Sequence, residues 1–171
     1  LSFSDLRFRP RALPEIDLST VDTRIEFLGK TIAAPIMISP MTGGTPRARI
    51  LNQRLARAAQ YFSIPFSVGS QRIALERPSL EPHFRVRSVA PTTPVFANLG
   101  AIQLVNGMGP DDALRAVEMI EADALFLHLD AVQEAIQPGG NTNWSGVLFA
   151  IVTVCDRLER RSGTPVFVRD V

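Results

Sequence analysis

The chain has 171 residues, of which 46% are hydrophobic and 20% charged, a balance typical of one globular domain with its own core. Eighteen basic and seventeen acidic residues leave a net charge of +1, which argues against a broad nucleic-acid-binding surface. No apolar run approaches the ~20 residues that span a membrane. The single cysteine, Cys155, excludes an intrachain disulfide and fits a cytoplasmic protein. Its apolar neighbours predict a packed thiol rather than a nucleophile.

The first part of the chain, residues 1–33, predicts an arm followed by a hairpin. Residues 1–18 are rich in arginine and proline and show little periodicity, so we expect an extended lead-in. Residues 23–27 and 31–33 are short strand-like runs on either side of Gly29 and Lys30. This pattern predicts a β-hairpin with its turn at those two residues.

From residue 34 the sequence alternates short apolar runs with helical patterns. Strands are predicted at residues 34–39, 65–68, 94–97, 124–129 and 165–169, and helices at 47–62, 78–89, 110–121 and 146–161. The predicted buried faces are Leu51, Leu55, Ala58, Ala59 and Phe62 in the first helix; Ala113, Leu114, Val117 and Ile120 in the third; and Val147, Leu148, Ile151, Cys155 and Leu158 in the fourth. Strands that recur at a spacing of about 30 residues indicate βα units.

Two architectures are built from such units, a doubly wound sheet and a (β/α)₈ barrel. The doubly wound dinucleotide fold calls for a G-x-G-x-x-G fingerprint after its first strand, and only the pair Gly43-Gly44 occurs there. Polar side chains instead follow every predicted strand, as they do around the rim of a barrel. A full barrel takes about 250 residues. We therefore expect residues 34–171 to form the first half, five strands, of a (β/α)₈ barrel.

The stretch 124–140 holds the densest group of candidate functional residues. Its apolar strand ends in a polar cluster comprising His128, Asp130, Gln133, Glu134 and Gln137. If the strand alternates faces, His128 and Asp130 share the face that carries Phe126. In α/β folds, chemistry lies beyond the carboxyl ends of such strands.

The strand-end sequences APIMISPMTGGT, PFSVGSQR, FANLGA, HLDAVQEAIQPGGNTNWSG and VFVRDV, taken in order, resemble type 2 isopentenyl-diphosphate isomerase. The resemblance covers nearly the whole chain, including its arm. That family consists of FMN-dependent (β/α)₈ barrels that convert isopentenyl diphosphate to dimethylallyl diphosphate. It uses reduced FMN, Mg²⁺ and a nicotinamide cofactor such as NADPH, which reduces the flavin.

The resemblance implies a role for each motif. The residues placed beside the flavin are Met41, Thr42, Gly43, Ser70, Asn98 and Arg169. The residues placed beside the diphosphate substrate are Ser70, Gln71, Arg72 and Gln133. His128 and Gln133 are the implied catalytic residues, and Glu134 is the implied Mg²⁺ ligand, a single carboxylate completed by phosphate and water.

Several of these residues also have plain structural readings. Arg72 reads equally as a surface arginine and Asn98 as a turn former before Gly100. Glu134 reads as a solvated carboxylate at a helix start, and His128 as a hydrogen-bonded structural histidine.

The chain departs from the family pattern on the substrate side of the rim. Arg169 stands where the family has a lysine, and Asp130 where it usually has an asparagine. Gly139 and Asn141 stand where Pro-Glu-Gly-Asp is common. The family's N-terminal Arg-Lys pair and the later strands that hold the FMN phosphate are not in this sequence.

The resemblance leads us to expect proton transfer in the complete protein, with the C3–C4 double bond protonated and a C2 proton lost, reduced FMN serving as acid and base. Isopentenyl diphosphate is the expected partner, and we expect a homo-oligomer because a half-barrel exposes its strand edges. Two alternatives stay open. One is another FMN barrel, such as a 2-hydroxy-acid oxidase relative, whose His-Gly-Gly-Arg-type segment is not found here. The other is an inactive, truncated half-barrel that binds a partner.

Overall fold

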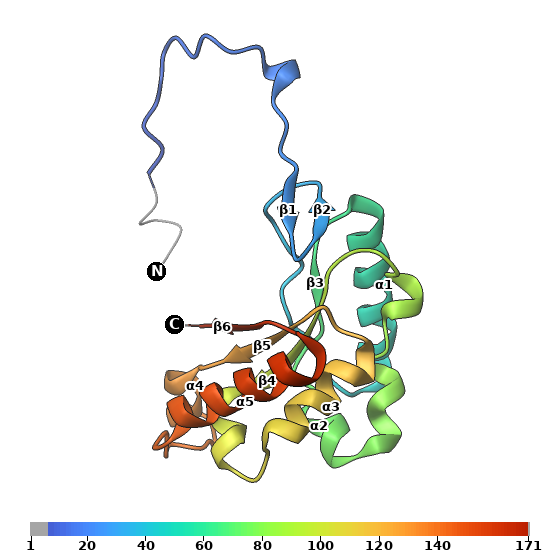
Figure 1. Ribbon diagram of the computed structural model, residues 1–171, viewed down its shortest axis with the longest axis vertical. Helices are drawn as coiled ribbons and strands as arrows, with labels where there is room; N and C mark the ends of the chain where they lie inside the picture. Colours follow the sequence, from blue (N-terminus) through green and yellow to red (C-terminus); the bar gives the residue numbers. More distant parts are fainter. Residues whose placement is uncertain (1–6, 171) are drawn as a thin grey trace.

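The computed structural model describes residues 7–170 (Figure 1). Residues 7–17 form an extended arm that leads through the 3₁₀ helix η2 (Leu18–Thr20) to a hairpin, so the expected lead-in is confirmed there, while residues 1–6 lie outside the described part. The hairpin pairs β1 (Ile25–Phe27) with β2 (Lys30–Ile32). Its turn is formed by Leu28 and Gly29, both with positive φ, one residue earlier than predicted.

The body of the structure is a parallel sheet in the order β3 (Phe66–Ser67), β4 (Val95–Gly100), β5 (Ala124–His128) and β6 (Val166–Arg169). Four of the five predicted strands are therefore confirmed. The predicted strand at residues 34–39 is wrong as a strand, since it contributes only an isolated bridge from Ile38 to Phe66. Pro35 and Pro40 flank that bridge and lack the N–H groups that a ladder needs.

Helices α1 (Pro46–Phe62), α3 (Pro110–Ile120) and α5 (Val147–Ser162) follow the predictions closely. The helix predicted at residues 78–89 is wrong. The chain there forms a short helix α2 (Arg72–Glu76) and two 3₁₀ turns, η3 (Pro78–His83) and η4 (Arg87–Val89). Pro82 explains this, because it lies inside the predicted helix and cannot donate an α-helical hydrogen bond.

The buried faces of two helices differ from the prediction. Helix α1 buries its small side chains Ala48, Ala56 and Ala59, while Leu51 and Phe62 are exposed. Helix α5 buries Val147, Val154 and Leu158, while Leu148 is exposed and Cys155 is half-buried. Burial raises the pKa of the Cys155 thiol, which makes it a poor nucleophile at neutral pH. In α3 the buried residues Ala113, Val117 and Ile120 confirm the predicted face, with Leu114 half-buried.

The two faces of the sheet have different coverings. Val95, Ala97, Leu99, Leu125 and Leu127 are fully buried in the core, together with residues of α3 and α5. The opposite face, which we call the inner face, carries Phe96, Asn98, Phe126, His128, Phe167 and Arg169.

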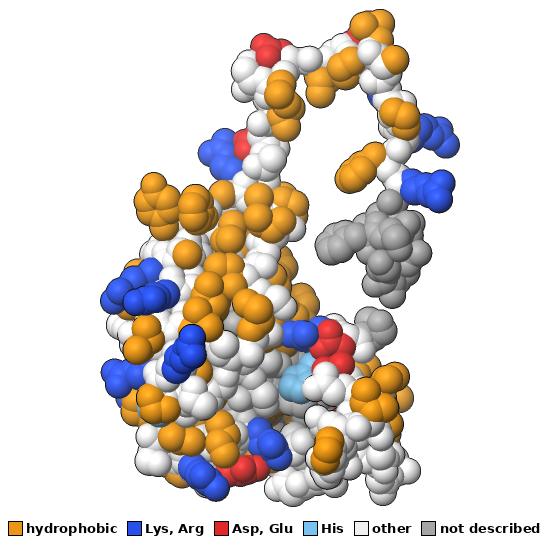
Figure 2. Space-filling model, turned by 180° about the vertical axis from the view of Figure 1, so that it is seen from behind, with side chains coloured by type: hydrophobic (Ala, Val, Ile, Leu, Met, Phe, Trp, Pro, Cys, Tyr) orange, Lys and Arg blue, Asp and Glu red, His pale blue; other side chains and the backbone are white. Residues whose placement is uncertain are grey.

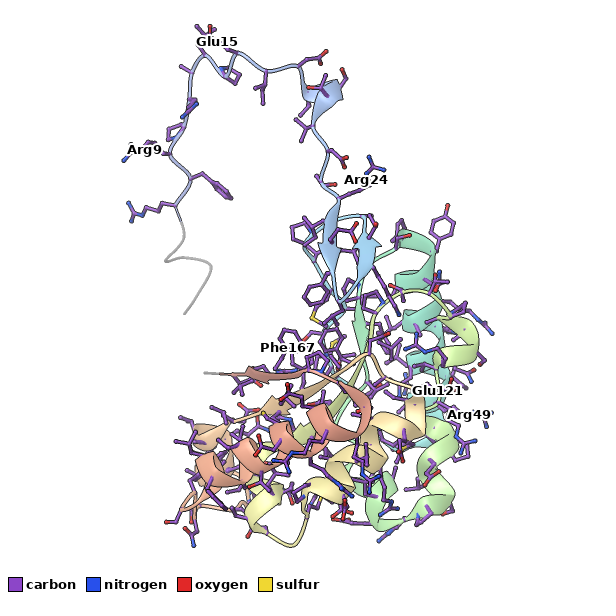
Figure 3. The ribbon with its side chains drawn as sticks, viewed as in Figure 1. Arg9, Glu15, Arg24, Arg49, Glu121 and Phe167 are labelled. Carbon is purple, nitrogen blue, oxygen red and sulfur yellow. The ribbon has the colours of Figure 1, made fainter. Side chains whose placement is uncertain are left out.

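The amino-terminal end of the inner face is lined by four aromatic rings, which we call the aromatic layer: Phe27, Phe96, Phe126 and Phe167. Phe96 lies at the centre, with its ring centroid 4.6 Å from Phe126, 5.6 Å from Phe167 and 6.0 Å from Phe27. Phe167 lies between β6 and the base of the hairpin (Figure 3). The hairpin thus covers the amino ends of the strands, while polar side chains remain at their carboxyl ends.

A charged cluster around Asp123 fastens this end of the sheet. The Asp123 carboxylate accepts hydrogen bonds from Lys30 Nζ at 2.6 Å, Arg87 Nη2 at 2.8 Å and the Val95 N–H at 2.8 Å. Burial by itself would raise the pKa of Asp123, but these bonds together outweigh it and hold the pKa below its usual value. The cluster therefore joins the hairpin, the turn η4 and the start of β4.

No helix within residues 7–170 is long and apolar enough to cross a membrane.

Candidate functional site

His128 is the last residue of β5 and stands on the inner face, at the polar ends of the strands. Its register partners are Gly100 on β4 and Arg169 on β6. A Cβ added to Gly100 would lie 3.1 Å from His128 Nε2, tighter than a normal contact. Gly100 therefore leaves the imidazole the room that it occupies.

Two interactions define the state of the imidazole. Asn98 Oδ1 lies 3.1 Å from His128 Nδ1, within hydrogen-bond distance. Burial lowers the pKa of His128, and the nearby cation Arg169 lowers it further. The carboxylates of Asp130, Asp170 and Glu134 act in the opposite direction without outweighing these effects. The neutral imidazole is therefore the favoured form at neutral pH.

Asp130 turns the chain just beyond the strand. The strand ends at His128, and Asp130 has a φ of 47° in the left-handed region, where it begins the helix α4 (Ala131–Ile136). The expectation that Asp130 extends the face of Phe126 and His128 is therefore wrong, because the strand alternation has already stopped. The helix α4 was not predicted, and it places Glu134 one turn after Asp130.

Glu134 is held by the loop that follows α4. Its Oε2 atom accepts a hydrogen bond of 2.6 Å from the Asn141 N–H. Gly140 lies against the same segment, where a Cβ would overlap the Glu134 carbonyl. Only glycine fits there, and this close approach folds residues 137–141 back over the helix.

These elements enclose a polar cavity of about 350 Å³, which we call the rim cavity. Its lining residues are Ser70, Arg72, Gly100, Gln103, His128, Glu134, Gln137, Pro138, Gly139 and Asn141. The structure thus brings together Ser70, Arg72, His128 and Glu134, which come from three segments: the loop into α2, the end of β5, and α4. Gln103, which lies in the 3₁₀ helix η5 (Ala101–Val105) after β4, was not predicted as a site residue, because no motif in the sequence marks it.

Arg72 and Glu134 supply the opposite charges of the rim cavity. Arg72 has a half-exposed side chain whose only ion pair in the described chain is a long one, 3.8 Å, to Glu76. Glu134 is the single carboxylate among the lining residues. Residues 7–170 contain no group of three or more His, Cys, Asp or Glu side chains that could hold a metal ion unaided. A cation at Glu134 would need further ligands from a bound molecule.

Seven of the expected site residues do not line the rim cavity: Met41, Thr42, Gly43, Gln71, Asn98, Gln133 and Arg169. Gln71 is fully buried and bonds to Ala116 and Asn98, so the expected contact between its side chain and a substrate is not supported. Gln133 is exposed on α4, because it lies on a different side of the helix from Glu134. Met41 is 68% exposed and also lies outside the cavity lining.

The segment Thr42–Gly43 lies beside the loop after β3. The Gly69 N–H donates to the Thr42 carbonyl at 3.0 Å, and Thr42 Oγ1 donates to Asn52 Oδ1 at 2.6 Å. A Cβ on Gly69 would overlap the Thr42 backbone, whereas a Cβ on Gly43 would meet only the Ser70 carbonyl, at 3.9 Å. Gly69 is therefore required by packing, and Gly43 leaves backbone open next to Ser70.

Comparison with known proteins gives two results at the sequence level. The family model described as FMN-dependent dehydrogenase matches residues 1–136. Proteins named isopentenyl-diphosphate delta-isomerase are 48% identical in Nostoc sp. (89% of this chain, 43% of the relative), 47% in Synechocystis sp. (99% and 47%) and 46% in Rickettsia prowazekii (97% and 47%). The chain spans about half the length of the curated relatives it matches.

Among solved structures, a mutant of an active chimera of (S)-mandelate dehydrogenase is similar, with a TM-score of 0.53 and 19% sequence identity. The match covers 96% of this chain and 53% of that one. At this identity the likeness concerns the α/β fold alone. Because the family model matches more than half of the residues, the chain belongs to the FMN-dependent dehydrogenase family.

Proposed function

We propose that residues 34–171 form the first half of a (β/α)₈ barrel behind the arm and hairpin of residues 1–33. We further propose that the complete protein isomerises isopentenyl diphosphate to dimethylallyl diphosphate with FMN and Mg²⁺. The identity of 46–48% to proteins named as that isomerase supports the reaction. The observation that carries it to this structure is the rim cavity, in which Ser70, Arg72, His128 and Glu134 converge.

The inner face fits the ring system of a flavin. A flavin ring has a flat apolar body and polar edges, and the inner face offers an aromatic layer with polar side chains above it. The Asn98 Nδ2 group makes no hydrogen bond within residues 7–170 and remains available as a donor. Arg169 supplies a cation on the same face, and the open backbone at Gly43 permits close approach. When bound, reduced FMN would supply the acid and base of the proton transfers.

The rim cavity fits the diphosphate end of the substrate. Arg72 offers a guanidinium, whose paired N–H donors match phosphate oxygens. Ser70 adds a hydroxyl donor on the same side. Glu134 fits a Mg²⁺ ion that is completed by diphosphate oxygens and water. These residues anchor the substrate and fix its position, which is the contribution to catalysis that we assign to them.

We also propose NADPH as the reductant of the flavin, on the resemblance of the motifs.

We further propose that this chain associates with a second copy or with a missing half. The first part of the chain carries exposed apolar side chains (Figure 2), and Phe8 and Leu18 are 99% and 83% exposed. An apolar groove of about 200 Å³ below the hairpin includes Ile36 and Met37. Light scattering from the purified chain tests this, and a compact monomer in dilute solution would contradict it.

The second candidate is oxidation of a 2-hydroxy acid, which the family model favours by its description. The relatives at 44–48% identity favour the isomerase instead, because the (S)-mandelate dehydrogenase structures are only 18–19% identical. The two reactions are separable in one experiment. The complete protein with reduced FMN and Mg²⁺ is given isopentenyl diphosphate. In parallel, the same protein with oxidised FMN, which can accept the two electrons, is given an aromatic and an aliphatic 2-hydroxy acid.

We expect dimethylallyl diphosphate from the first reaction and no 2-oxo acid from the second. The variant Arg72→Met should raise KM by about 10-fold to 100-fold, since a hydrogen bond to a charged group contributes ~1.5–3 kcal/mol. Arg85→Met is the matched control, because Arg85 also makes a partly exposed ion pair, with Glu81 at 3.4 Å, away from the rim cavity. Absence of dimethylallyl diphosphate from flavin-loaded protein would refute the proposed function.

A further inference from the structure

Gln71 is the only polar residue among the largest fully buried side chains of the described chain. It follows Ser70 directly and is the N-cap residue of α2, just after the segment of β3 leaves the sheet. A glutamine in the core is stable only when its amide is fully hydrogen-bonded, because an unpaired buried amide costs ~1–3 kcal/mol. The partners of this amide therefore indicate what the residue does.

The amide joins β4 to α3. Its Oε1 accepts from the Asn98 N–H at 3.0 Å, and its Nε2 donates to the Ala116 carbonyl at 2.8 Å. The backbone N–H of Gln71 also donates to the Asn98 carbonyl at 2.9 Å. Both backbone groups of Asn98 are thus bound by one residue. The amide has a single consistent orientation, since an N–H can only donate and a carbonyl can only accept.

The fixed position of Asn98 in turn determines its contact with His128. With its backbone fixed on both sides, Asn98 directs Oδ1 to within 3.1 Å of His128 Nδ1. A carbonyl oxygen accepts only, so in this contact Nδ1 carries the ring proton. The other nitrogen, Nε2, faces the space left by Gly100, which lines the rim cavity.

We propose that Gln71 is a positioning residue that holds Asn98 in place. The Nδ1–H of His128 then donates its hydrogen bond to Asn98. Nε2 is left as the only nitrogen of the ring that can form hydrogen bonds with groups in the rim cavity. Neutral His128 then accepts a hydrogen bond at Nε2, and a proton gained by the ring is added at Nε2, toward an anion in the cavity. That the anion is a diphosphate rests on the proposed function, whereas the tautomer does not. Gln71 thus acts without touching the substrate.

The test is ¹⁵N NMR of the 171-residue chain labelled at its histidine rings, recorded at a pH where the imidazoles are neutral and without added ligand. The chain contains only His83 and His128, so a His83→Asn sample assigns the signals. His83 is an internal reference, because its Nδ1 lies 2.7 Å from the Gly44 carbonyl and should carry the proton as well. We expect the parent chain to show a protonated Nδ1 and an unprotonated Nε2 at His128.

The variant Gln71→Met removes both amide bonds at nearly constant size and should abolish the fixed tautomer, so that the two ring nitrogens of His128 average between protonated and unprotonated positions. Gln71→Glu keeps the acceptor for the Asn98 N–H and, with its buried carboxyl protonated, a donor for the Ala116 carbonyl, so it should restore the Nδ1–H form. Gln60→Met is the matched control. Gln60 also makes three hydrogen bonds, two from the Thr92 and Thr93 N–H groups and one to Thr92 Oγ1, at the opposite end of the sheet.

Two results would overturn the proposal. One is a protonated Nε2 in the parent chain, which decides the matter even if no variant folds. The other is an unchanged Nδ1–H signal in Gln71→Met while His83 keeps its parent signals. Because no flavin or diphosphate is added, a protein that fails to isomerise isopentenyl diphosphate leaves both outcomes readable.

Discussion

Replacement of Asp123 by asparagine should destabilise the chain far more than an ordinary surface substitution. The carboxylate accepts three hydrogen bonds, two of them from the cations Lys30 and Arg87, and only 21% of its side chain is exposed. Asparagine keeps one acceptor oxygen but loses the charge, so Arg87 remains largely buried without a counterion. Removal of one partner of a buried pair costs ~3–5 kcal/mol, and the partial exposure places Asp123→Asn near the lower end.

A loss of about 3 kcal/mol should lower the Tm by roughly 6–12 °C in a chain of this size. Thermal unfolding followed by circular dichroism measures this directly. Asp111→Asn is the matched control, because Asp111 also forms a short ion pair, with Arg157, but is 77% exposed. Exposed pairs contribute at most about 1 kcal/mol, so the control should melt close to the parent.

The pH dependence gives a second check with a definite sign. The pKa of Asp123 is lower in the folded chain than its ordinary value of 3.8. Its stabilising contribution is therefore complete above pH 3.8 and is lost as the pH falls through the lower, folded-state pKa. The gap in Tm between parent and Asp123→Asn should be constant near neutral pH and should narrow below pH 3.8. Equal melting of the two proteins at pH 7, or a gap that does not narrow in acid, would refute the role assigned to this cluster.

Three further substitutions, and Gly43→Ala as a control for the first of them, test the rim. Gly69→Ala should destabilise the chain by more than ~2 kcal/mol, because the added Cβ meets backbone that cannot move aside. Gly43→Ala, whose Cβ has open space, should unfold in urea at the same concentration as the parent. Equal destabilisation by the two substitutions would contradict the assigned packing. In the complete protein, Glu134→Gln should weaken Mg²⁺-dependent turnover by at least 10-fold while flavin stays bound, and an unchanged Mg²⁺ dependence would remove Glu134 from the metal site. Arg169→Ala should weaken binding of reduced FMN more than of oxidised FMN, because the reduced form carries the extra negative charge; a redox titration that gives the parent's midpoint potential would place Arg169 elsewhere.

The parallel strands were predictable because the information is local. Residues 124–127 form an uninterrupted apolar run that leads into polar residues, and a strand buried on both faces needs such a run. The same reasoning placed Ser70, His128 and Glu134 at strand ends, where the structure gathers them around one cavity together with Arg72, which was selected through the family resemblance.

The remaining features depend on contacts between distant segments. The buried state of Gln71 follows from its bonds to Asn98 and Ala116, 27 and 45 residues away, so a polar Ser-Gln-Arg segment reads locally as exposed. The left-handed turn at Asp130 decides where α4 begins, and an aspartate gives only a weak signal for that conformation. In helix α1 the small residues Ala48, Ala56 and Ala59 are the buried ones, while Leu51 and Phe62 remain exposed. Periodicity alone does not distinguish these two sets of residues.

The aromatic layer divides the inner face into two regions, and substitutions in the two regions should differ strongly in their effect on the stability of the fold. Phe27, Phe96 and Phe167 hold the hairpin and the strand starts together, on the same side as the Asp123 cluster. Arg169 and Asp130, two residues that differ from the isomerase pattern which the sequence resembles, lie beyond that layer, toward the carboxyl ends of the strands. Replacement of a rim side chain such as Arg72 or Arg169 should therefore leave the folding of the sheet nearly untouched, whereas Gly69 is required by packing. Such a separation allows the chemistry of the rim to drift over generations while the scaffold below it stays the same.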